Sequence, residues 1–250
     1  MKVSIITICF NSAITLERTI LSVINQNVDN IEYLVIDGAS TDGTVSIIKK
    51  YDKYITKWTS EKDNGISDAF NKAIRLATGD LICLLNSDDE LLPNTVKMIT
   101  ELAKPDADII HGNIIVHKID KMQYICKPSL DYSLLLKKSM ILNHPGMFIA
   151  KRAYQKFGLY NMAYRCAMDR ELLARMYSKN AVFQYIDTEL VVFYQGGEST
   201  KNFLRHAIPE DFKISISYGA NYILTILFSV KKIVLFSLPI IKKKILNIFK

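Results

Sequence analysis

The sequence predicts an α/β fold, in which helices flank a mostly parallel β-sheet. The first half of the chain alternates short β-branched runs with amphipathic stretches, which is the pattern of successive βαβ units. The run Leu81–Leu85 is apolar at every position, as expected of a parallel strand that is buried on both faces. With 49% hydrophobic and 23% charged residues, the 250-residue chain has the composition of a folded core, which excludes disordered and collagen-like classes.

The elements are expected in a regular order along the chain. The β-branched run at the amino terminus is followed by an Asn–Ser turn, and Ser12 is the expected cap of the first helix. We predict strands at Val3–Cys9, Tyr33–Asp37, Ile55–Thr59, Leu81–Leu85 and Ile109–Gly112, and helices at Ala13–Gln26, Thr44–Tyr51, Ile66–Ala77 and Asn94–Ala103. Beyond about Gly112 the alternation fades, and a helix-like run spans Met168–Tyr177. Because no repeat or linker-like composition divides the chain, one continuous domain is expected over residues 1–211.

The net charge of +7 comes from the carboxyl-terminal tail. Residues 212–250 contain seven of the 32 basic residues and no acidic residue, so residues 1–211 carry 25 basic and 25 acidic groups. A neutral body gives no support to a nucleic-acid-binding surface, and no nucleic-acid partner is expected. The four cysteines show no metal-ligand spacing, and Cys9 and Cys83 lie in apolar runs, as expected of reduced core residues in a cytosolic protein. No amino-terminal secretory signal is expected either.

The tail combines apolar residues with clustered lysines. Its charge-free stretches at residues 220–230 and 233–241 are too short for the roughly 20 residues that cross a bilayer. Apolar anchors beside lysines, without acids, favour an amphipathic helix that lies on an anionic membrane surface. The alternative is a helix that packs on the body or pairs with a second copy to form a homodimer. We therefore expect a basic, membrane-associating tail over residues 212–250 and a protein attached peripherally to the inner face of the cell membrane.

Two polar segments follow predicted strands. Asp37 begins a turn of small residues that ends at Thr44, and its carboxylate can accept the ring N–H of a base. Asn86–Asp89 follows an apolar strand and offers oxygen atoms to a hard divalent cation. Helix capping is the alternative for both segments. Ligands of open parallel sheets bind beyond the carboxyl ends of the strands, and both segments lie there, which favours a binding site.

Five segments in order carry a resemblance to a known family. They are Thr7–Ser12, Asp37–Thr44, Glu61–Lys72, Ala77–Asp80 and Asn86–Asp89. These segments resemble successive blocks of the family 2 glycosyltransferases, whose members have the GT-A fold and transfer a sugar from a nucleotide diphosphate with inversion. A further segment, Gly158–Arg175, resembles the acceptor-side region of that family. The resemblance implies a nucleotide-sugar-binding half over residues 1–115 and an acceptor-side half over residues 116–211.

The resemblance also implies a nucleotide pocket. Thr7 and Asn11 would line it, and Asp37 would hold the uracil of a UDP-sugar. Asp68 and Asn71, on the helix that follows Gly65, would face the ribose or the diphosphate.

A divalent metal is implied at the end of the apolar strand. Asp88 stands where the metal-binding acid of the family's Asp-x-Asp motif stands, but the first acid of that motif is Asn86 here. An amide oxygen can still ligate a cation or accept a hydrogen bond, so we expect Mn²⁺ or Mg²⁺ to be the cofactor.

Asp169 matches the family's catalytic acid at the start of the acceptor-side helix. An inverting displacement needs a base that takes the proton of the acceptor hydroxyl, and the resemblance gives Asp169 this role. The alternative is a first-turn acid that the helix dipole favours. Glu171 is the neighbour that could be confused with it, but two residues along a helix turn its side chain by about 200°, so both cannot face the acceptor.

Two further segments resemble parts of bacterial polysaccharide members of the family. His144, in a His–Pro–Gly turn, and the loop Gly196–Ser199 could flank the diphosphate or the sugar. A structural histidine and a simple chain reversal are the alternatives.

The expected function is an inverting glycosyltransferase of bacterial surface polysaccharide synthesis. It would move a sugar from a UDP-sugar to a glycan or an undecaprenyl-diphosphate-linked saccharide. One rival is a sugar-1-phosphate nucleotidyltransferase, which would need a Gly-rich basic loop after the first strand, and Cys9–Ser12 has neither feature. The other rival is a non-catalytic nucleotide-sugar-binding protein, which the replacement of the first motif acid by Asn86 makes conceivable.

Overall fold

The computed structural model describes residues 1–196 and 203–248. Within these residues, nine strands form a single sheet with the order β3-β2-β1-β4-β8-β6-β9-β5, and β7 pairs with β6. The strands are β1 (Val3–Cys9), β2 (Ile31–Asp37), β3 (Lys57–Ser60), β4 (Leu81–Leu84), β5 (Glu90–Leu91), β6 (Ile109–His117), β7 (Gln123–Cys126), β8 (Phe148–Ala150) and β9 (Phe183–Tyr194). The predicted α/β class is therefore confirmed.

The sheet is parallel in its first half and mixed in its second. β3, β2, β1 and β4 run parallel to one another. β8 lies between β4 and β6 and runs antiparallel to both, whereas β9 is parallel to β6. As a result, the first four strands end at one edge of the sheet, and the segment that leads into β8 begins at that same edge.

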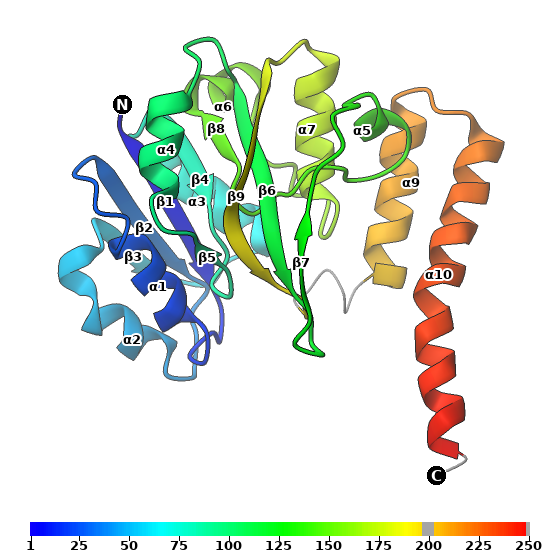
Figure 1. Ribbon diagram of the computed structural model, residues 1–250, viewed down its shortest axis with the longest axis horizontal. Helices are drawn as coiled ribbons and strands as arrows, with labels where there is room; N and C mark the ends of the chain where they lie inside the picture. The colour runs from blue at the N-terminus through cyan, green and yellow to red at the C-terminus, as the bar shows by residue number, and fades with distance from the viewer. Residues whose placement is uncertain (197–202, 249–250) are drawn as a thin grey trace.

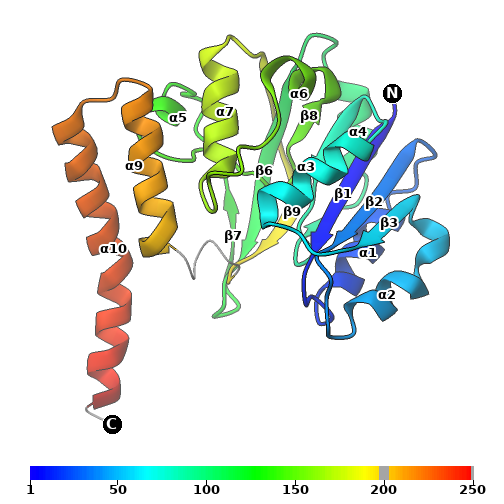
Figure 2. The same cartoon turned by 180° about the vertical axis from the view of Figure 1, so that it is seen from behind.

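Helices cover both faces of this sheet. They are α1 (Leu16–Ile24), α2 (Thr44–Lys50), α3 (Ile66–Leu76), α4 (Thr95–Leu102), α5 (Leu134–Lys137), α6 (Lys151–Phe157), α7 (Met168–Ser178), α9 (Ile208–Ser217) and α10 (Tyr222–Ile248), with a 3₁₀ turn η1 (Asp52–Tyr54) and a π turn η2 (Phe203–Ala207). α1 and α4 lie on the face turned to the viewer in Figure 1. α3, α6 and α7 lie on the opposite face, which Figure 2 shows.

The apolar pattern explains this layering. In α1 the buried residues Leu16, Ile20 and Val23 share one face of the helix, which packs on the sheet. The central strands are covered on both faces, so that all four residues of β4 are buried without alternation.

The first helix begins later than predicted. It starts at Leu16 with Thr15 as its N-cap residue, and Ser12 does not cap it through its side chain. Instead, the backbone N–H of Ser12 donates to Thr44 Oγ1 at 2.8 Å, and that of Ala13 donates to Asp42 Oδ2 at 3.0 Å. The expected cap is therefore wrong, because this segment is tied to the loop that follows β2 before the helix can begin.

The carboxyl-terminal helices stand beside the sheet. α9 lies next to α7 and α5, and α10 lies beyond α9, at the end of the molecule far from β3 (Figure 1). The expected boundary after residue 211 falls inside α9, where Ile214 and Ser215 are buried. The described helices include none that combines the length and the apolar content that a bilayer span requires.

Candidate functional site

The loops that follow the parallel strands form a connected rim. The backbone N–H of Asn11 donates to Ser40 Oγ at 2.7 Å, and that of Thr41 donates to Asn11 Oδ1 at 2.9 Å. The hydroxyls of Ser12 and Ser87 lie 2.9 Å apart, which links the loop after β1 to the loop after β4. The structure therefore brings these polar segments together at one edge of the sheet, where parallel sheets bind ligands.

Asp37 is fully buried at the centre of this rim. Its carboxylate accepts hydrogen bonds from the backbone N–H of Ser40 at 3.0 Å and from the Ser60 hydroxyl at 2.6 Å. The ring of Phe10 is 63% exposed beside it, and a Cβ on Gly38 would lie 3.4 Å from that ring. That Cβ would also lie 2.6 Å from Asp63 Oδ2, so Asp63 closes this side of Gly38, and Phe10 presents the exposed aromatic face next to the buried Asp37 carboxylate.

The two other predicted pocket residues from β1 and its loop are placed differently. Thr7 is fully buried within the sheet, and its hydroxyl accepts a hydrogen bond from the Tyr33 hydroxyl at 3.1 Å. Asn11 is exposed and holds a left-handed backbone conformation with φ of 49°, and its amide oxygen fixes the next loop through Thr41. In this structure Asn11 borders the rim, while Thr7 supports it from below.

The acidic pair after β4 divides into one structural and one open carboxylate. Asp89 is fully buried and accepts hydrogen bonds from the backbone N–H of Tyr194 at 3.2 Å and from Asn86 Nδ2 at 3.1 Å. Burial, and then the charge of Asp88, raise the pKa of the Asp89 carboxyl to about 8. Asp88 is partly exposed, and Arg18 donates to its backbone carbonyl at 2.7 Å.

The Asp88 carboxylate suits a divalent cation that the protein and a bound phosphate ligand hold together. Burial raises the pKa of its carboxyl, which means that a nearby cation would be favourable there. Within the part of the chain that the structure describes, no three His, Cys, Asp or Glu side chains are placed to hold a metal ion. A Mg²⁺ ion commonly takes one or two carboxylates and completes its shell with substrate phosphates and water. The residues present suit that arrangement and not a cage made by the protein alone.

The two predicted residues on α3 are already engaged. Asp68 is buried and accepts a hydrogen bond from the backbone N–H of Asn64 at 3.0 Å, which, with Lys72, lowers the pKa of its carboxyl. The amide of Asn71 exchanges two hydrogen bonds of 2.9 Å with the backbone of Tyr160. Asn71 therefore joins α3 to the α6–α7 loop (residues 158–167), whereas Asp68 stabilises the segment that leads into α3.

His144 and Asp169 meet at the same edge of the sheet. Cys83 of β4 pairs with Phe148 of β8, so the segment before β8, with His144, lies beyond the end of β4 near Asn86–Asp89. The Nε2 atom of His144 lies 3.4 Å from Oδ1 of Asp169 and 2.9 Å from the Tyr160 hydroxyl. The strand order therefore brings an acid of α7 to the rim that the amino-terminal strands form.

Asp169 carries an unsatisfied buried oxygen. The Oδ1 atom is buried and has no hydrogen-bond partner among the described residues, although the side chain as a whole is 22% exposed. Burial raises the pKa of this carboxyl, and the charge of His144, when protonated, lowers it. Buried polar atoms in folded proteins are nearly always hydrogen-bonded, so a carboxylate oxygen that has only the 3.4 Å contact with His144 among the described residues suggests a ligand.

Glu171 has a different role, as its position on the helix predicts. Both of its carboxylate oxygens bind Arg175, at 2.9 Å and 3.1 Å. Arg175 in turn donates to the backbone carbonyls of Phe157 and Leu159. Glu171 is thus part of an ion pair that holds the α6–α7 loop.

Sequence reasoning missed Phe10 and Tyr160. The sequence shows that Phe10 is an aromatic residue directly after the apolar run of β1, but its exposure is seen only in the structure. Tyr160 acts through its backbone and its buried hydroxyl, and only the fold reveals these contacts. Of the Gly196–Ser199 loop, Gly196 has a φ of 125°, and the other three residues lie outside the described residues.

Comparison with known proteins gives a consistent picture. Residues 4–176 match the family described as Glycosyl transferase family 2. An uncharacterized glycosyltransferase of Mycobacterium tuberculosis is 30% identical over 179 residues, which cover 69% of this chain and 68% of that protein. Chondroitin synthase of Escherichia coli is 27% identical over 191 residues, which cover 74% of this chain and 28% of the synthase.

Two solved structures share the fold. TarS of Staphylococcus aureus, residues 1–349 in complex with UDP-GlcNAc, superposes with a TM-score of 0.66 at 15% identity, over 90% of this chain and 69% of that one. A mannosyltransferase of Pyrobaculum calidifontis, in complex with GDP-Man and Mn²⁺, superposes with a TM-score of 0.67 at 18% identity, over 86% and 64% of the two chains.

Proposed function

The chain belongs to glycosyl transferase family 2, and we propose that it is an inverting transferase that moves a sugar from a UDP-sugar to a saccharide acceptor. One observation carries this proposal. The orphaned oxygen of Asp169 and the partly buried carboxylate of Asp88 belong to segments that meet at one edge of the sheet. Such a site can hold a diphosphate leaving group and a base for the incoming hydroxyl.

The nucleotide is assigned to the rim between β1 and β2. The exposed side chain of Phe10 offers a face on which a base can stack. Asp37 is assigned to a base N–H, which would replace one of the donors from Ser40 and Ser60 that its buried carboxylate now accepts. Uracil presents such an N–H. The complex of TarS with UDP-GlcNAc supports a uridine donor on this fold, while the GDP-Man complex of the Pyrobaculum enzyme makes guanosine the alternative.

Asp169 is assigned as the general base. As the acceptor oxygen attacks C1 of the donor sugar, its proton passes to Asp169, and the bond between C1 and the diphosphate oxygen breaks with its electron pair on the departing nucleoside diphosphate. Burial raises the pKa of Asp169, which makes it a stronger base than an exposed aspartate. His144, at 3.4 Å, orients the carboxylate.

A divalent cation is assigned to the diphosphate. Asp88 would hold it, with Asn86 beside it, and a bound Mn²⁺ or Mg²⁺ would neutralise charge on the leaving group. The Mn²⁺ in the Pyrobaculum complex supports this assignment.

The acceptor is assigned to the half formed by residues 116–211, and the donor to residues 1–115. Asp169 lies in the former and Asp88 in the latter. The similarity to a chondroitin synthase supports a growing glycan as acceptor, in surface polysaccharide synthesis. An undecaprenyl-diphosphate-linked saccharide is the lipid-linked form of such an acceptor.

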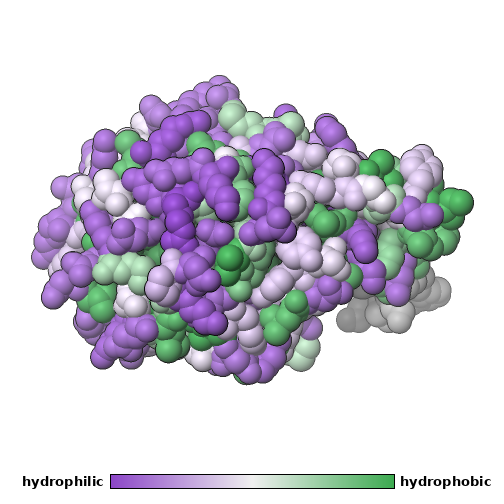
Figure 3. Space-filling model, turned by 90° about the horizontal axis from the view of Figure 1, so that it is seen from above, coloured by the Kyte–Doolittle hydropathy of each residue, from purple (hydrophilic) through white to green (hydrophobic). Residues whose placement is uncertain are grey.

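Association with an anionic membrane surface from the cytoplasmic side is assigned to α10. Its first half exposes large apolar side chains, which include Ile223 at 68%, Leu224 at 63% and Leu227 at 59%. Figure 3 shows hydrophobic side chains at the end of the molecule where α9 and α10 lie. Lys231 is exposed next to them, and the sequence beyond continues with lysines and no acid.

A non-catalytic nucleotide-sugar-binding protein is the second candidate, and Asn86 in place of an acid favours it. A screen of UDP-sugars and GDP-Man with Mn²⁺ separates the two. We expect one UDP-sugar to raise the melting temperature and to release UDP when saccharide acceptors are added. Thermal stabilisation without any release of nucleotide, with or without acceptor, would support the second candidate instead.

A further inference from the structure

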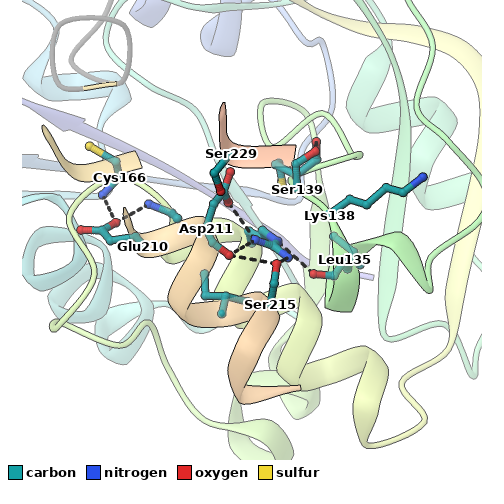
Figure 4. A network of polar contacts seen from close by, with 12 residues as sticks. Leu135, Lys138, Ser139, Cys166, Glu210, Asp211, Ser215 and Ser229 are labelled. Carbon is teal, nitrogen blue, oxygen red and sulfur yellow. Dashed lines mark hydrogen bonds and ion pairs between the residues drawn. The ribbon is translucent and has the colours of Figure 1, made fainter. Parts of the chain in front are cut away.

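A carboxylate of α9 binds the turn that leads into α7. Glu210 Oε1 accepts a hydrogen bond of 2.9 Å from the backbone N–H of Arg165. Its Oε2 accepts two more, of 2.9 Å and 2.8 Å, from the backbone N–H groups of Cys166 and Ala167. Figure 4 shows this carboxylate pointing from α9 to the segment that contains Cys166. Three successive N–H groups therefore depend on one side chain from a helix about 40 residues later in the sequence.

A second link joins the same two helices. Arg170 of α7 is 1% exposed and donates to Asp211 Oδ1 at 3.0 Å, to Ser215 Oγ at 2.8 Å and to the Leu135 carbonyl at 2.9 Å. Figure 4 shows Asp211, Ser215 and Leu135 close together, with dashed lines for the polar contacts of this network. Lys232 of α10 binds the other oxygen of Asp211 at 2.5 Å.

The α6–α7 loop is also held on its other side. The Asn71 amide fixes Tyr160, and the Ser67 hydroxyl donates to the Tyr164 carbonyl at 3.3 Å, so α3 holds the middle of the loop. Glu210 holds its last residues. Asp169 follows Ala167 by two positions, and its Oδ1 has no hydrogen bond of its own among the described residues. The direction of this carboxylate is therefore set by the backbone at the start of α7 and by the contact with His144.

We propose that Glu210 is a positioning residue, which holds the turn that leads into α7 so that the Asp169 carboxylate faces the acceptor hydroxyl. This inference rests on the proposed function, in which Asp169 is the base. Without Glu210, three N–H groups would lose their acceptor and the turn would move to find others. A displacement of about 1 Å at a reacting group costs on the order of 10²-fold in rate. The carboxyl-terminal helices thus complete the active site, besides any contact with a membrane.

The test compares substitutions of two buried carboxylates in the full-length protein. Glu210→Ala removes the acceptor, and Glu210→Gln keeps the size and one acceptor oxygen. Glu32→Gln is the matched control, because Glu32 is also buried and accepts a backbone N–H, from Thr78 at 2.7 Å, but lies near the start of β2, away from the rim. The readouts are kcat and the donor KM, the pH profile of kcat, and hydrogen exchange of the amides at residues 163–172.

We expect kcat to fall roughly 10- to 100-fold in Glu210→Ala and less in Glu210→Gln, with the donor KM within about twofold of the native value. In the pH profile of kcat, the acidic limb should lie at a different pH from that of the native enzyme, because the Asp169 carboxylate has moved. The backbone amides before α7 should exchange their hydrogens with solvent faster. Glu32→Gln should lower the melting temperature without these changes. If Glu210→Ala does not fold, Glu210→Gln alone decides.

Native kcat and pH profile in a folded Glu210 variant would overturn the inference, as would unchanged hydrogen exchange at residues 163–172. If the native protein transfers no sugar, the proposed function fails. In that case hydrogen exchange still decides whether Glu210 holds the turn that leads into α7.

Discussion

His144 Nε2 lies 3.4 Å from Asp169 Oδ1, and this contact joins the two halves of the site. His144 precedes β8, which pairs with β4, whereas Asp169 begins α7. The Tyr160 hydroxyl binds the same histidine nitrogen at 2.9 Å, and the ring of Phe70 packs 5.8 Å from the imidazole. A proton acceptor is thus fixed beside the segment that carries Asp88.

Replacement of the proposed base should separate catalysis from binding. Asp169→Asn keeps the size of the side chain but removes its basicity, so we expect kcat to fall by roughly 10² to 10⁴, the range of general-base catalysis, with little change in the donor dissociation constant. Steady-state kinetics and calorimetric titration of the donor measure the two quantities.

Glu171→Gln is the control for this substitution. It breaks the ion pair with Arg175, so it should lower the melting temperature while the folded enzyme keeps its kcat within a few fold. If Glu171→Gln loses turnover and Asp169→Asn retains it, the base has been assigned to the wrong carboxylate.

The pH profile should report the histidine contact. The base works in its charged form, and burial raises the pKa of Asp169, so the acidic limb of kcat should lie above the ordinary range of an aspartate. A protonated His144 lowers this pKa. We therefore expect His144→Gln to move the acidic limb to higher pH, and Tyr132→Phe, which alters a hydroxyl bound to a different histidine, to leave it unchanged. A limb that stays in place, or moves to lower pH, in His144→Gln would contradict the account.

Metal dependence should follow one carboxylate of the acidic pair. Asp88→Ala should reduce turnover by at least about 10²-fold and abolish the effect of Mn²⁺ on UDP binding, since Asp88 is the acid assigned to the cation. Asp89→Asn should act mainly on stability, because Asp89 already binds Tyr194 and Asn86. Titration of UDP with and without Mn²⁺, in each variant and with a chelator, measures this. Undiminished turnover of the native enzyme in chelator would refute the metal assignment.

The fold could largely be predicted from the sequence, because it depends on local pattern. β1 and its neighbours follow from apolar runs, and the family resemblance, carried by five short segments, is confirmed by the match over residues 4–176. The position of β8 could not be predicted, since three residues give no periodic signal. Yet this short antiparallel strand is what places His144 beside the amino-terminal rim.

The site was harder to predict than the fold. Motif spacing indicates which residue types lie at the sheet edge, but it does not show which of their oxygen atoms are left without a protein partner and can bind a ligand. Asn71, assigned to the nucleotide, binds the backbone of Tyr160 through its amide, and Glu210, which no motif indicated, binds three N–H groups before α7. Such contacts between distant segments follow from tertiary structure alone.

The tail should bind anionic membranes through charge. A chain that ends after Gly219 keeps α9 and should lose its affinity for anionic vesicles while it retains donor binding. Each lysine near such a surface contributes on the order of 1 kcal/mol, so Lys242, Lys243 and Lys244 changed together to Gln should release much of the protein, and added salt should do the same. Cosedimentation with anionic and neutral vesicles measures this. Equal binding to both lipids at every salt concentration would rule out the electrostatic contribution, and a truncated chain that aggregates would favour a packed helix.

The stereochemistry of transfer tests the central claim most directly. In donors such as UDP-GlcNAc the sugar is α-linked to the nucleotide, so a single displacement with Asp169 as base must give a β-linked product. Proton NMR of the product formed by the native enzyme, recorded as it accumulates, identifies the anomer from the coupling of its anomeric proton. We predict a β-glycoside from the native enzyme and, from Asp169→Asn, the same product at a rate lower by at least about 10²-fold. An α-glycoside, or an Asp169→Asn variant that forms the same product at the native rate, would contradict the account.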